Sequence, residues 1–209
     1  MFNKKREEEG IKIALLGNPG VGKTCIISKY MHDTFNENKV EINGINYSGK
    51  TIKIRGKEVE LTIWEIPSQE KFQSMSNYFY RDANVICLVY DITNQDSFNS
   101  LQNKWIKDVK NYGEKYNILA VVGNKLDLFE KKKVTEDEGK QYADEINAIF
   151  MLTSAKTGDG IEKLFYILAG KFDDPLFKFK VKEMKGGRNQ PFILNDGKND
   201  GCCKKKKCC

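Results

Sequence analysis

The feature that most constrains this chain is a glycine-rich segment, residues 17–24, which reads GNPGVGKT and fits the phosphate-loop pattern GxxxxGK[ST]. An apolar run typical of a strand, residues 11–16, comes before it, and residues 24–31 have a helix-forming pattern after it. Between a strand and a helix, such a loop turns its backbone N–H groups toward a phosphate chain at the positive end of the helix. A glycine-rich turn without a ligand is the alternative, but the Lys-Thr pair favours a site for a nucleoside polyphosphate.

The loop also predicts individual contacts. Lys23 would reach the β- and γ-phosphates, and the Thr24 hydroxyl would hold Mg²⁺. The predicted phosphate-binding residues are Gly17, Asn18, Pro19, Gly20, Val21, Gly22, Lys23, Thr24 and Cys25.

Apolar runs and helical patterns alternate along the chain, which is typical of a doubly wound α/β sheet. Strands are predicted at residues 11–16, 47–54, 59–66, 84–90, 118–122 and 148–152, with a hairpin turn near residues 55–57. Helices are predicted at residues 24–31, 70–80, 97–112, 136–145 and 161–172. We therefore expect a single P-loop NTPase domain whose six-stranded, mostly parallel sheet is flanked by five helices, with ligands at the carboxyl ends of the strands.

Charge and composition divide the chain into three parts. Residues 1–10 are a charged N-terminal extension, residues 11–172 the folded domain, and residues 173–209 a basic tail predicted to be disordered. Ten Lys/Arg and five Asp/Glu give the tail +5 of the net charge of +6. A basic tail on a near-neutral domain indicates an anionic surface as partner and disfavours nucleic acid.

Several classes are excluded or disfavoured. No apolar stretch reaches a transmembrane length, and the first ten residues hold no signal-peptide core. His32 is the single histidine, which excludes multi-histidine metal sites and His-paired nucleophiles. Cys25 and Cys87 fit apolar helix and strand patterns, and the other four cysteines lie in the last eight residues. This is not a disulfide framework, so we expect a cytoplasmic protein.

The base is predicted by a second motif, Asn124-Lys125-Leu126-Asp127, directly after the strand at residues 118–122. A carboxylate can accept two parallel hydrogen bonds from N1–H and N2–H₂ of guanine, and adenine offers no such pair. An NKxD motif alone is a weak signal, but here it follows a P-loop and precedes TSAK at residues 153–156. Together they predict a guanine nucleotide. Asp127 and the lack of a substrate domain disfavour a P-loop kinase or ATPase.

These motifs resemble the Ras-like small GTPases and, within them, the Rab family. LVYDIT at residues 88–93 is similar to the Rab fourth-strand signature, FYRDA at residues 79–83 is similar to the Rab segment YYRGA, and the chain ends in Cys208-Cys209. The resemblance covers about residues 10–172 and the extreme C-terminus. It implies a membrane-trafficking switch that binds GTP/GDP and Mg²⁺ and hydrolyses GTP slowly. It also implies a monomer that meets a Rab escort protein or GDI, an exchange factor, a GTPase-activating protein and effectors.

The resemblance also assigns roles to single residues. The implied guanine-binding residues are Phe35, Asn124, Lys125, Asp127, Ser154, Ala155 and Lys156. Phe35 would stack on the base, its alternative being a core contact at the helix end. Gln69 would orient the attacking water, and Glu65 would hold Mg²⁺ through water beside Thr24. The implied effector patch is Tyr47, Trp64 and Phe79, although Tyr47 could equally be an aromatic that packs the hairpin.

Both switch segments depart from the family pattern. Ile42 stands where the family places a threonine, and the second switch reads EIPSQE at residues 65–70 in place of DTAGQE. Isoleucine has no hydroxyl for Mg²⁺. Ser68 replaces a glycine whose N–H meets the γ-phosphate, and Pro67 stiffens the approach. The alternative function is therefore a pseudo-GTPase, a membrane-tethered binding module with little hydrolysis.

The tail combines thiols with four consecutive lysines, residues 204–207. Its Cys208-Cys209 ending resembles the substrate of the Rab-type geranylgeranyltransferase, and two lipid chains, or one with a basic patch, hold a protein firmly on a membrane. A Cys-rich metal-binding tail is the alternative. With lipids at Cys208 and Cys209, and Lys204, Lys205, Lys206 and Lys207 on anionic headgroups, the domain would sit on the cytosolic face of an endomembrane.

Overall fold

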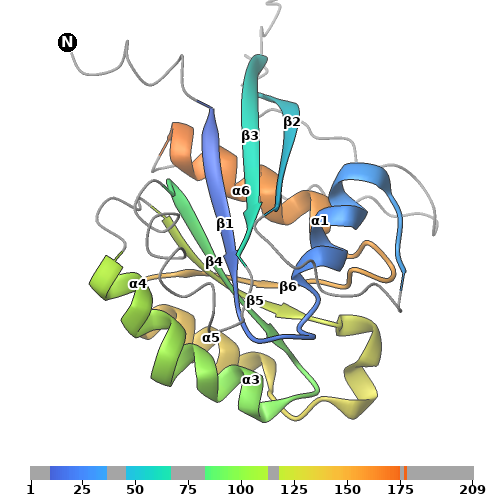
Figure 1. Ribbon diagram of the computed structural model, residues 1–209, viewed down its shortest axis with the longest axis vertical. Helices are drawn as coiled ribbons and strands as arrows, with labels where there is room; N and C mark the ends of the chain where they lie inside the picture. Colours follow the sequence, from blue (N-terminus) through green and yellow to red (C-terminus); the bar gives the residue numbers. More distant parts are fainter. Residues whose placement is uncertain (1–9, 37–45, 67–82, 113–117, 175–176, 178–209) are drawn as a thin grey trace, which may run out of the picture.

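The structure, a computed structural model, describes residues 10–36, 46–66, 83–112, 118–174 and 177. Its centre is a six-stranded sheet with the order β2-β3-β1-β4-β5-β6 (Figure 1). The strands are β1 Ile11–Leu16, β2 Asn46–Ile54, β3 Lys57–Glu65, β4 Val85–Asp91, β5 Ile118–Asn124 and β6 Ile149–Leu152. Only the β2–β3 pair is antiparallel, and the other neighbours are parallel.

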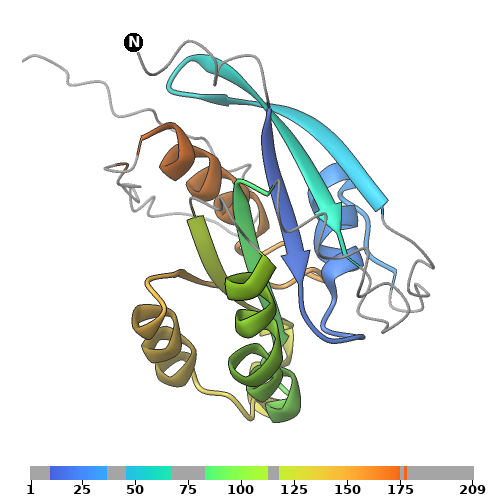
Figure 2. The ribbon, with the colours of Figure 1, turned by 60° about the vertical axis from the view of Figure 1, so that its left-hand side comes forward.

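The described helices are α1 Lys23–His32, α3 Gln95–Ser100, the π-helix η2 Leu101–Trp105, α4 Ile106–Tyr112, the 3₁₀-helix η3 Leu126–Lys131, α5 Glu136–Glu145 and α6 Ile161–Asp173. Helices α1 and α6 cover one face of the sheet, and α3, η2, α4 and α5 cover the other. Figure 2 shows this second layer from the side, with α5 next to the continuous helix formed by α3, η2 and α4.

The central strands are buried on both faces because helices lie above and below them. All seven residues of β4 are buried, as expected for a strand in the middle of a parallel sheet. Successive side chains alternate between two cores. Val85, Cys87 and Val89 pack toward α1 and α6, whereas Ile86 and Leu88 pack toward η2 and α5. Burial raises the pKa of Cys87 to about 12, so this thiol stays protonated and unreactive.

The β2–β3 hairpin turns at Arg55 and Gly56, which have φ of 49° and 81°. Two successive residues with positive φ form the tight turn whose twist suits a hairpin. The hairpin register pairs Tyr47 with Trp64 and Asn46 with Glu65. On its other side β3 pairs with β1, with Glu65 opposite Leu15, so the end of β3 lies at the carboxyl end of the parallel strands, where the phosphate loop begins.

The predicted α/β domain, with its six-stranded, mostly parallel sheet, is confirmed. Most boundaries differ from the prediction by one or two residues. The helix predicted at residues 97–112 starts at Gln95 and contains a π-turn, and the 3₁₀-helix η3 was not predicted. The helix predicted at residues 70–80 lies outside the described residues. Within the described part of the chain, no helix has the length and apolar character needed to span a bilayer.

Candidate functional site

The phosphate loop joins β1 to α1, and its glycines are required by close backbone contacts. Gly17 and Gly22 have φ of 147° and 96°, values that residues with a side chain rarely adopt. A Cβ on Gly17 would collide with the backbone carbonyl of Val89, and one on Gly22 would collide with the side-chain amide of Asn124. The loop can therefore pack against β4 and β5 only because these positions carry no side chain.

Lys23 begins α1 and is 4% exposed. Its Nζ donates hydrogen bonds to the carbonyl oxygens of Gly17 at 2.9 Å and Asn18 at 3.0 Å. The ammonium group is thus held inside the curve of the loop by the loop's own backbone. This is the place from which a lysine can meet phosphate oxygens gathered at the helix N-terminus.

A contact that sequence analysis missed holds the loop from its other side. The Trp105 indole Nε1–H donates to Asn18 Oδ1 at 2.9 Å, and Asn18 Nδ2 donates to the Ser100 hydroxyl at 2.9 Å. Trp105 is 4% exposed and lies in the π-helix η2. The Asn18 side chain therefore bonds to Ser100 of α3 and Trp105 of η2, while its backbone carbonyl accepts from Lys23.

The two predicted Mg²⁺ residues meet directly. The Thr24 hydroxyl donates a hydrogen bond to Glu65 Oε1, and Glu65 is buried at the end of β3. A hydroxyl and a carboxylate are hard oxygen ligands of the kind Mg²⁺ prefers, and this ion commonly keeps several waters and takes the rest of its ligands from phosphates. Thr24 and Glu65 therefore fit a magnesium ion held by one hydroxyl, nucleotide oxygens and water.

Asn124 ends β5 and is 1% exposed. Its Nδ2 donates to the carbonyl of Val21 at 2.8 Å, and its Oδ1 accepts from the Thr153 hydroxyl at 3.2 Å and the Ala155 N–H at 3.3 Å. The side chain thus ties the phosphate loop to the loop after β6. The structure gives this residue of the NKxD motif a bracing role between the two loops.

Asp127 and Lys125 are each oriented by a neighbouring side chain. The Ser154 hydroxyl donates to Asp127 Oδ1 at 2.6 Å. Lys125 has a positive φ of 69°, and its Nζ pairs with Asp91 Oδ2 at 2.7 Å. Asp91 Oδ1 in turn accepts from the N–H of Thr93 at 2.8 Å. The carboxylate of the DIT segment at residues 91–93 therefore fixes the lysine that follows β5.

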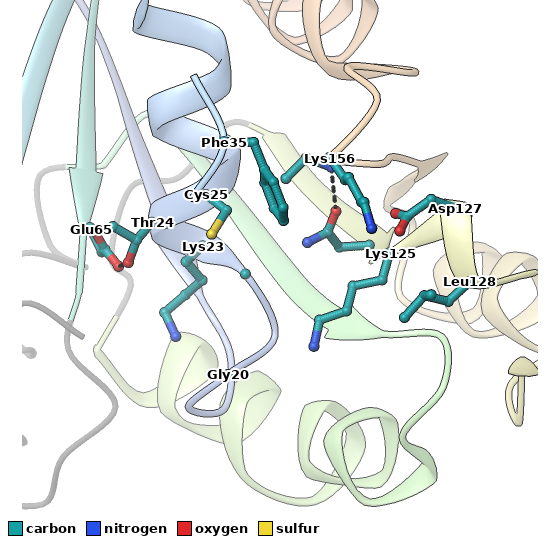
Figure 3. Close-up of a pocket in the computed structure, with 13 residues that line it drawn as sticks. Gly20, Lys23, Thr24, Cys25, Phe35, Glu65, Lys125, Asp127, Leu128 and Lys156 are labelled. Carbon is teal, nitrogen blue, oxygen red and sulfur yellow. Dashed lines mark hydrogen bonds between the residues drawn. The ribbon is translucent and has the colours of Figure 1, made fainter. Parts of the chain in front are cut away.

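Residues of the phosphate loop, the NKxD motif and the loop after β6 line one pocket at the carboxyl end of the parallel strands, shown in Figure 3. At one end lie Lys23, Thr24 and Glu65, and at the other end Asp127 and Lys156, with Phe35 between them. The remaining lining residues are Gly20, Gly22, Cys25, Asn124, Lys125, Leu128 and Ala155. Leu128 was not predicted, because it follows the motif inside the unpredicted helix η3. Phe35 is 36% exposed and lines this pocket, and its stacking on a base stays a prediction.

Some predicted site residues lie elsewhere or outside the description. Tyr47 and Trp64 form a tilted aromatic pair with ring centroids 5.3 Å apart, and Tyr47 remains 66% exposed. This pair lies on the hairpin at the edge of the sheet, so it both packs the hairpin and presents an aromatic surface. Gln69, Phe79, Ile42, Ser68, Cys208 and Cys209 lie outside the described residues.

A phosphate loop and an NKxD motif that meet in one pocket of such a sheet define a P-loop guanine-nucleotide-binding protein. Comparisons with known proteins agree, since the sequence model of the Ras family matches residues 12–174. The chain is 33% identical to the Ras-related protein SEC4 of Saccharomyces cerevisiae over 207 residues, which covers 99% of this chain and 94% of the relative. It is 37% identical to the Ras-related protein Rab-30 of Homo sapiens over 158 residues, 76% of this chain and 77% of the relative.

A third relative, the Ras-related protein Rab-10 of Diplobatis ommata, is 37% identical over 206 residues, 99% of this chain and 98% of the relative. The chain therefore belongs to the Ras family of small GTPases, as a protein of the Rab type.

Proposed function

We propose that this chain is a Rab-type trafficking switch that binds GTP or GDP in the pocket between Lys23 and Asp127 and hydrolyses GTP slowly. The observation that carries the proposal is that Lys23 of the phosphate loop and Asp127 of the NKxD motif line the same pocket. A nucleotide has its base and its phosphates at opposite ends, and the pocket has matching groups at its two ends.

Guanine selection rests on Asp127. Ser154 holds its Oδ1, and the carboxylate can accept side-by-side hydrogen bonds from N1–H and N2–H₂ of guanine. Adenine would leave these acceptors unpaired, which is costly in a site built for hydrogen bonding. Phe35 and Lys156 would cover the base, and the backbone around Ala155 would face its carbonyl oxygen.

The phosphate end would combine loop amides, Lys23 and the pair Thr24–Glu65. Thr24 and Glu65 would hold Mg²⁺ there, and the ion would supply charge neutralisation for the phosphates. A water oriented by Gln69 would attack the γ-phosphorus in line, and the bond from this phosphorus to the β–γ bridging oxygen would break to give GDP and inorganic phosphate. The chain's contribution is positioning and charge stabilisation.

Slow hydrolysis is proposed because Ile42, Pro67 and Ser68 replace family residues around the γ-phosphate. Misplaced groups at this step can cost on the order of a thousandfold in rate. The second candidate, a pseudo-GTPase that keeps nucleotide as a structural cofactor, is favoured by the same three residues. The two candidates share the pocket and differ in turnover.

Single-turnover GTP hydrolysis, with and without Mg²⁺, separates them. If the chain is a switch, we expect measurable Mg²⁺-dependent turnover that rises in the variant carrying Ile42→Thr and Ser68→Gly. If it is a pseudo-GTPase, we expect no turnover in the natural chain. Asp127→Ala should weaken GDP binding by more than about tenfold, since two charge-assisted hydrogen bonds are lost. GDP affinity that is unchanged in both Asp127→Ala and Lys23→Ala would contradict nucleotide binding at this pocket.

Membrane attachment is proposed through geranylgeranyl groups on Cys208 and Cys209, aided by Lys204–Lys207 at about 1 kcal/mol per lysine near an anionic leaflet. Replacing both cysteines with serine should move the protein from the membrane to the soluble fraction, because lysines alone bind reversibly and are screened by salt. A double variant that stays membrane-bound in high salt would contradict lipid anchoring. The partners proposed by family are an escort protein or GDI, an exchange factor, a GTPase-activating protein, and effectors at the Tyr47–Trp64 pair.

A further inference from the structure

We infer that Trp105 is a positioning residue for nucleotide phosphates, acting through Asn18 on the lysine of the phosphate loop. The inference rests on the proposed nucleotide binding and adds a residue on a helix outside the pocket. The contact that carries it is the hydrogen bond of 2.9 Å from the Trp105 indole Nε1 to Asn18 Oδ1.

Asn18 connects this indole to Lys23. Its side chain accepts from Trp105 and donates to the Ser100 hydroxyl at 2.9 Å, and its backbone carbonyl accepts from Lys23 Nζ at 3.0 Å. The same residue therefore bonds to the helix with its side chain and to the phosphate-binding ammonium with its main chain. Moving the side chain would move the carbonyl that orients Lys23.

The π-helix η2 supplies the fixed side of this connection. Trp105 is its last residue, and its first residue, Leu101, has a carbonyl that accepts from the Ile106 N–H and also from the buried Tyr142 hydroxyl at 3.3 Å. The Tyr142 bond holds the wide turn from α5. π-Turns are rare, occur mostly as single turns inside α-helices, and are frequent at functional sites. Here the wide turn carries Trp105, whose indole donates to the side chain of the loop residue Asn18.

The next residue, Pro19, adds to the effect. A residue before proline is restricted to extended backbone conformations, so Asn18 has little freedom to rotate its carbonyl. Proline also fixes its own φ. Loop conformation is thus set on three sides: by the ring of Pro19, by the indole of Trp105, and by Lys23 itself. A preorganised loop binds phosphate without first losing conformational freedom.

The test compares Asn18→Ala and Trp105→Phe with the unaltered full chain in GDP dissociation, followed with a fluorescent GDP in excess unlabelled GDP. Trp105→Phe removes the indole hydrogen bond, and Asn18→Ala removes this bond together with the one to the Ser100 hydroxyl, so we expect dissociation to accelerate by about three- to tenfold in each variant. The double variant should be no faster than the faster single variant, since both break the same bond. Binding of GMP, which lacks the β-phosphate, should change by less than about twofold.

Phe177→Ala is the control for lost stability, because it removes a buried ring that packs on α6 in the core on the other face of the sheet from Trp105. It should lower the melting temperature and leave GDP dissociation unchanged. If Trp105→Phe does not fold, Asn18→Ala, at a half-buried loop position, tests the same bond. Equal losses for GDP and GMP, additive effects in the double variant, or unchanged dissociation would each overturn the inference. An unaltered chain that binds no GDP would instead overturn the proposed function.

A fluorescence measurement gives an independent readout. The chain has two tryptophans, so Trp64→Phe leaves Trp105 as the sole tryptophan, which can be excited selectively over the tyrosines. We expect its emission to change when GDP is added, and we expect Asn18→Ala to abolish that change while GDP still binds at saturating concentration. A Trp105 emission that ignores GDP in the Trp64→Phe chain would contradict the coupling.

Discussion

The side-chain amide of Asn124 donates a hydrogen bond to the backbone carbonyl of Val21 at 2.8 Å, across 103 residues of sequence. Gly22, the next residue of the loop, could not carry a Cβ without striking this amide. The NKxD motif and the phosphate loop are therefore built as one unit. A change at either position should be felt at both ends of the pocket.

Asn124→Ala should lower the free energy of unfolding by about 2 kcal/mol, because it leaves buried partners such as the Val21 carbonyl and the Thr153 hydroxyl without their bonds. It should also weaken GDP binding. Chemical denaturation without nucleotide measures the first effect and a GDP titration the second. Asn124→Asp is the comparison: it keeps the acceptor for Thr153 but sets a buried carboxylate oxygen against the Val21 carbonyl, so it should be at least as destabilising. An Asn124→Ala variant as stable as the natural chain would show that the hydrogen bonds of Asn124 do not stabilise the fold.

Tyr90→Phe should be neutral or stabilise the fold by up to about 1 kcal/mol. Tyr90 is fully buried in β4, and among the described residues its hydroxyl has no hydrogen-bond partner. Burial also raises the pKa of this phenol, aided by Glu138 and Glu136, so it stays neutral. A buried polar group without a partner costs free energy, and its removal ends that cost. The ring contact with Phe98, at 4.9 Å between centroids, is kept.

The matched comparison for Tyr90 is Tyr142→Phe, because the Tyr142 hydroxyl has a partner, the Leu101 carbonyl. That variant should lose about 1 kcal/mol. Thermal denaturation of the two variants side by side should therefore give shifts of opposite sign or, at the least, a clear difference. Equal losses would mean that the Tyr90 hydroxyl is satisfied after all.

Much of this fold could be predicted because its signals are local. Glycine spacing and apolar periodicity specify the strand, loop and helix around residues 17–24. Helix α5 is specified by its own helical pattern and its capping box. The predicted bounds of α5, residues 136–145, agree with the structure. Each of these elements depends on neighbours within a few residues. Composition and spacing carry that information directly.

The rest of the site depends on contacts between distant residues. The Trp105–Asn18 bond spans 87 residues, and Asn124 meets partners 103 and 29 residues away. No periodicity records such pairs. The π-turn in the helix predicted at residues 97–112 is set by the Leu101 carbonyl, which also accepts from Tyr142 on another helix. Sequence patterns could indicate the helix there but not its extra residue.

The start of α5 predicts a pH dependence. Thr135 and Glu138 form a capping box, in which hydrogen bonds from the Thr135 side chain and backbone lower the pKa of the Glu138 carboxyl from its ordinary value of 4.5. The pKa in the folded chain is below that in the unfolded chain. The stabilisation is therefore complete above the ordinary value and is lost as the pH falls through the folded value.

Glu138→Gln should remove this part of the acid sensitivity, because glutamine can keep the bonds of a capping box and does not titrate. The group is exposed, so the effect should be no more than about half a kcal/mol. Urea denaturation of the natural chain and the Glu138→Gln variant, at pH 7 and at pH values below the ordinary pKa of 4.5, measures this difference in stability. An identical pH dependence in the two chains would contradict the assignment.

Phe177 marks where the folded part of the chain reaches beyond residue 172. It is 5% exposed, its ring meets Tyr166 edge-on with centroids 5.8 Å apart, and Arg55 of the hairpin turn lies over it at 5.0 Å. Arg55 also pairs with Asp174 at 2.9 Å. Phe177→Ala should therefore cost about 3 kcal/mol, the low end for a buried phenylalanine, because the site is near the edge of the core.

Gly170 turns this contact into a test with a change of sign. It lies inside α6, where Gly→Ala ordinarily stabilises a helix by about 1 kcal/mol. Here an added Cβ would lie 2.6 Å from a ring carbon of Phe177, closer than carbon atoms can pack. Gly170→Ala should therefore destabilise the natural chain by about 1 to 3 kcal/mol through overpacking. In the Phe177→Ala background the ring is gone, so the same change should become stabilising. Denaturant unfolding of the four chains measures both signs, and a Gly170→Ala effect with the same sign in both backgrounds would contradict the packing of Phe177 on α6.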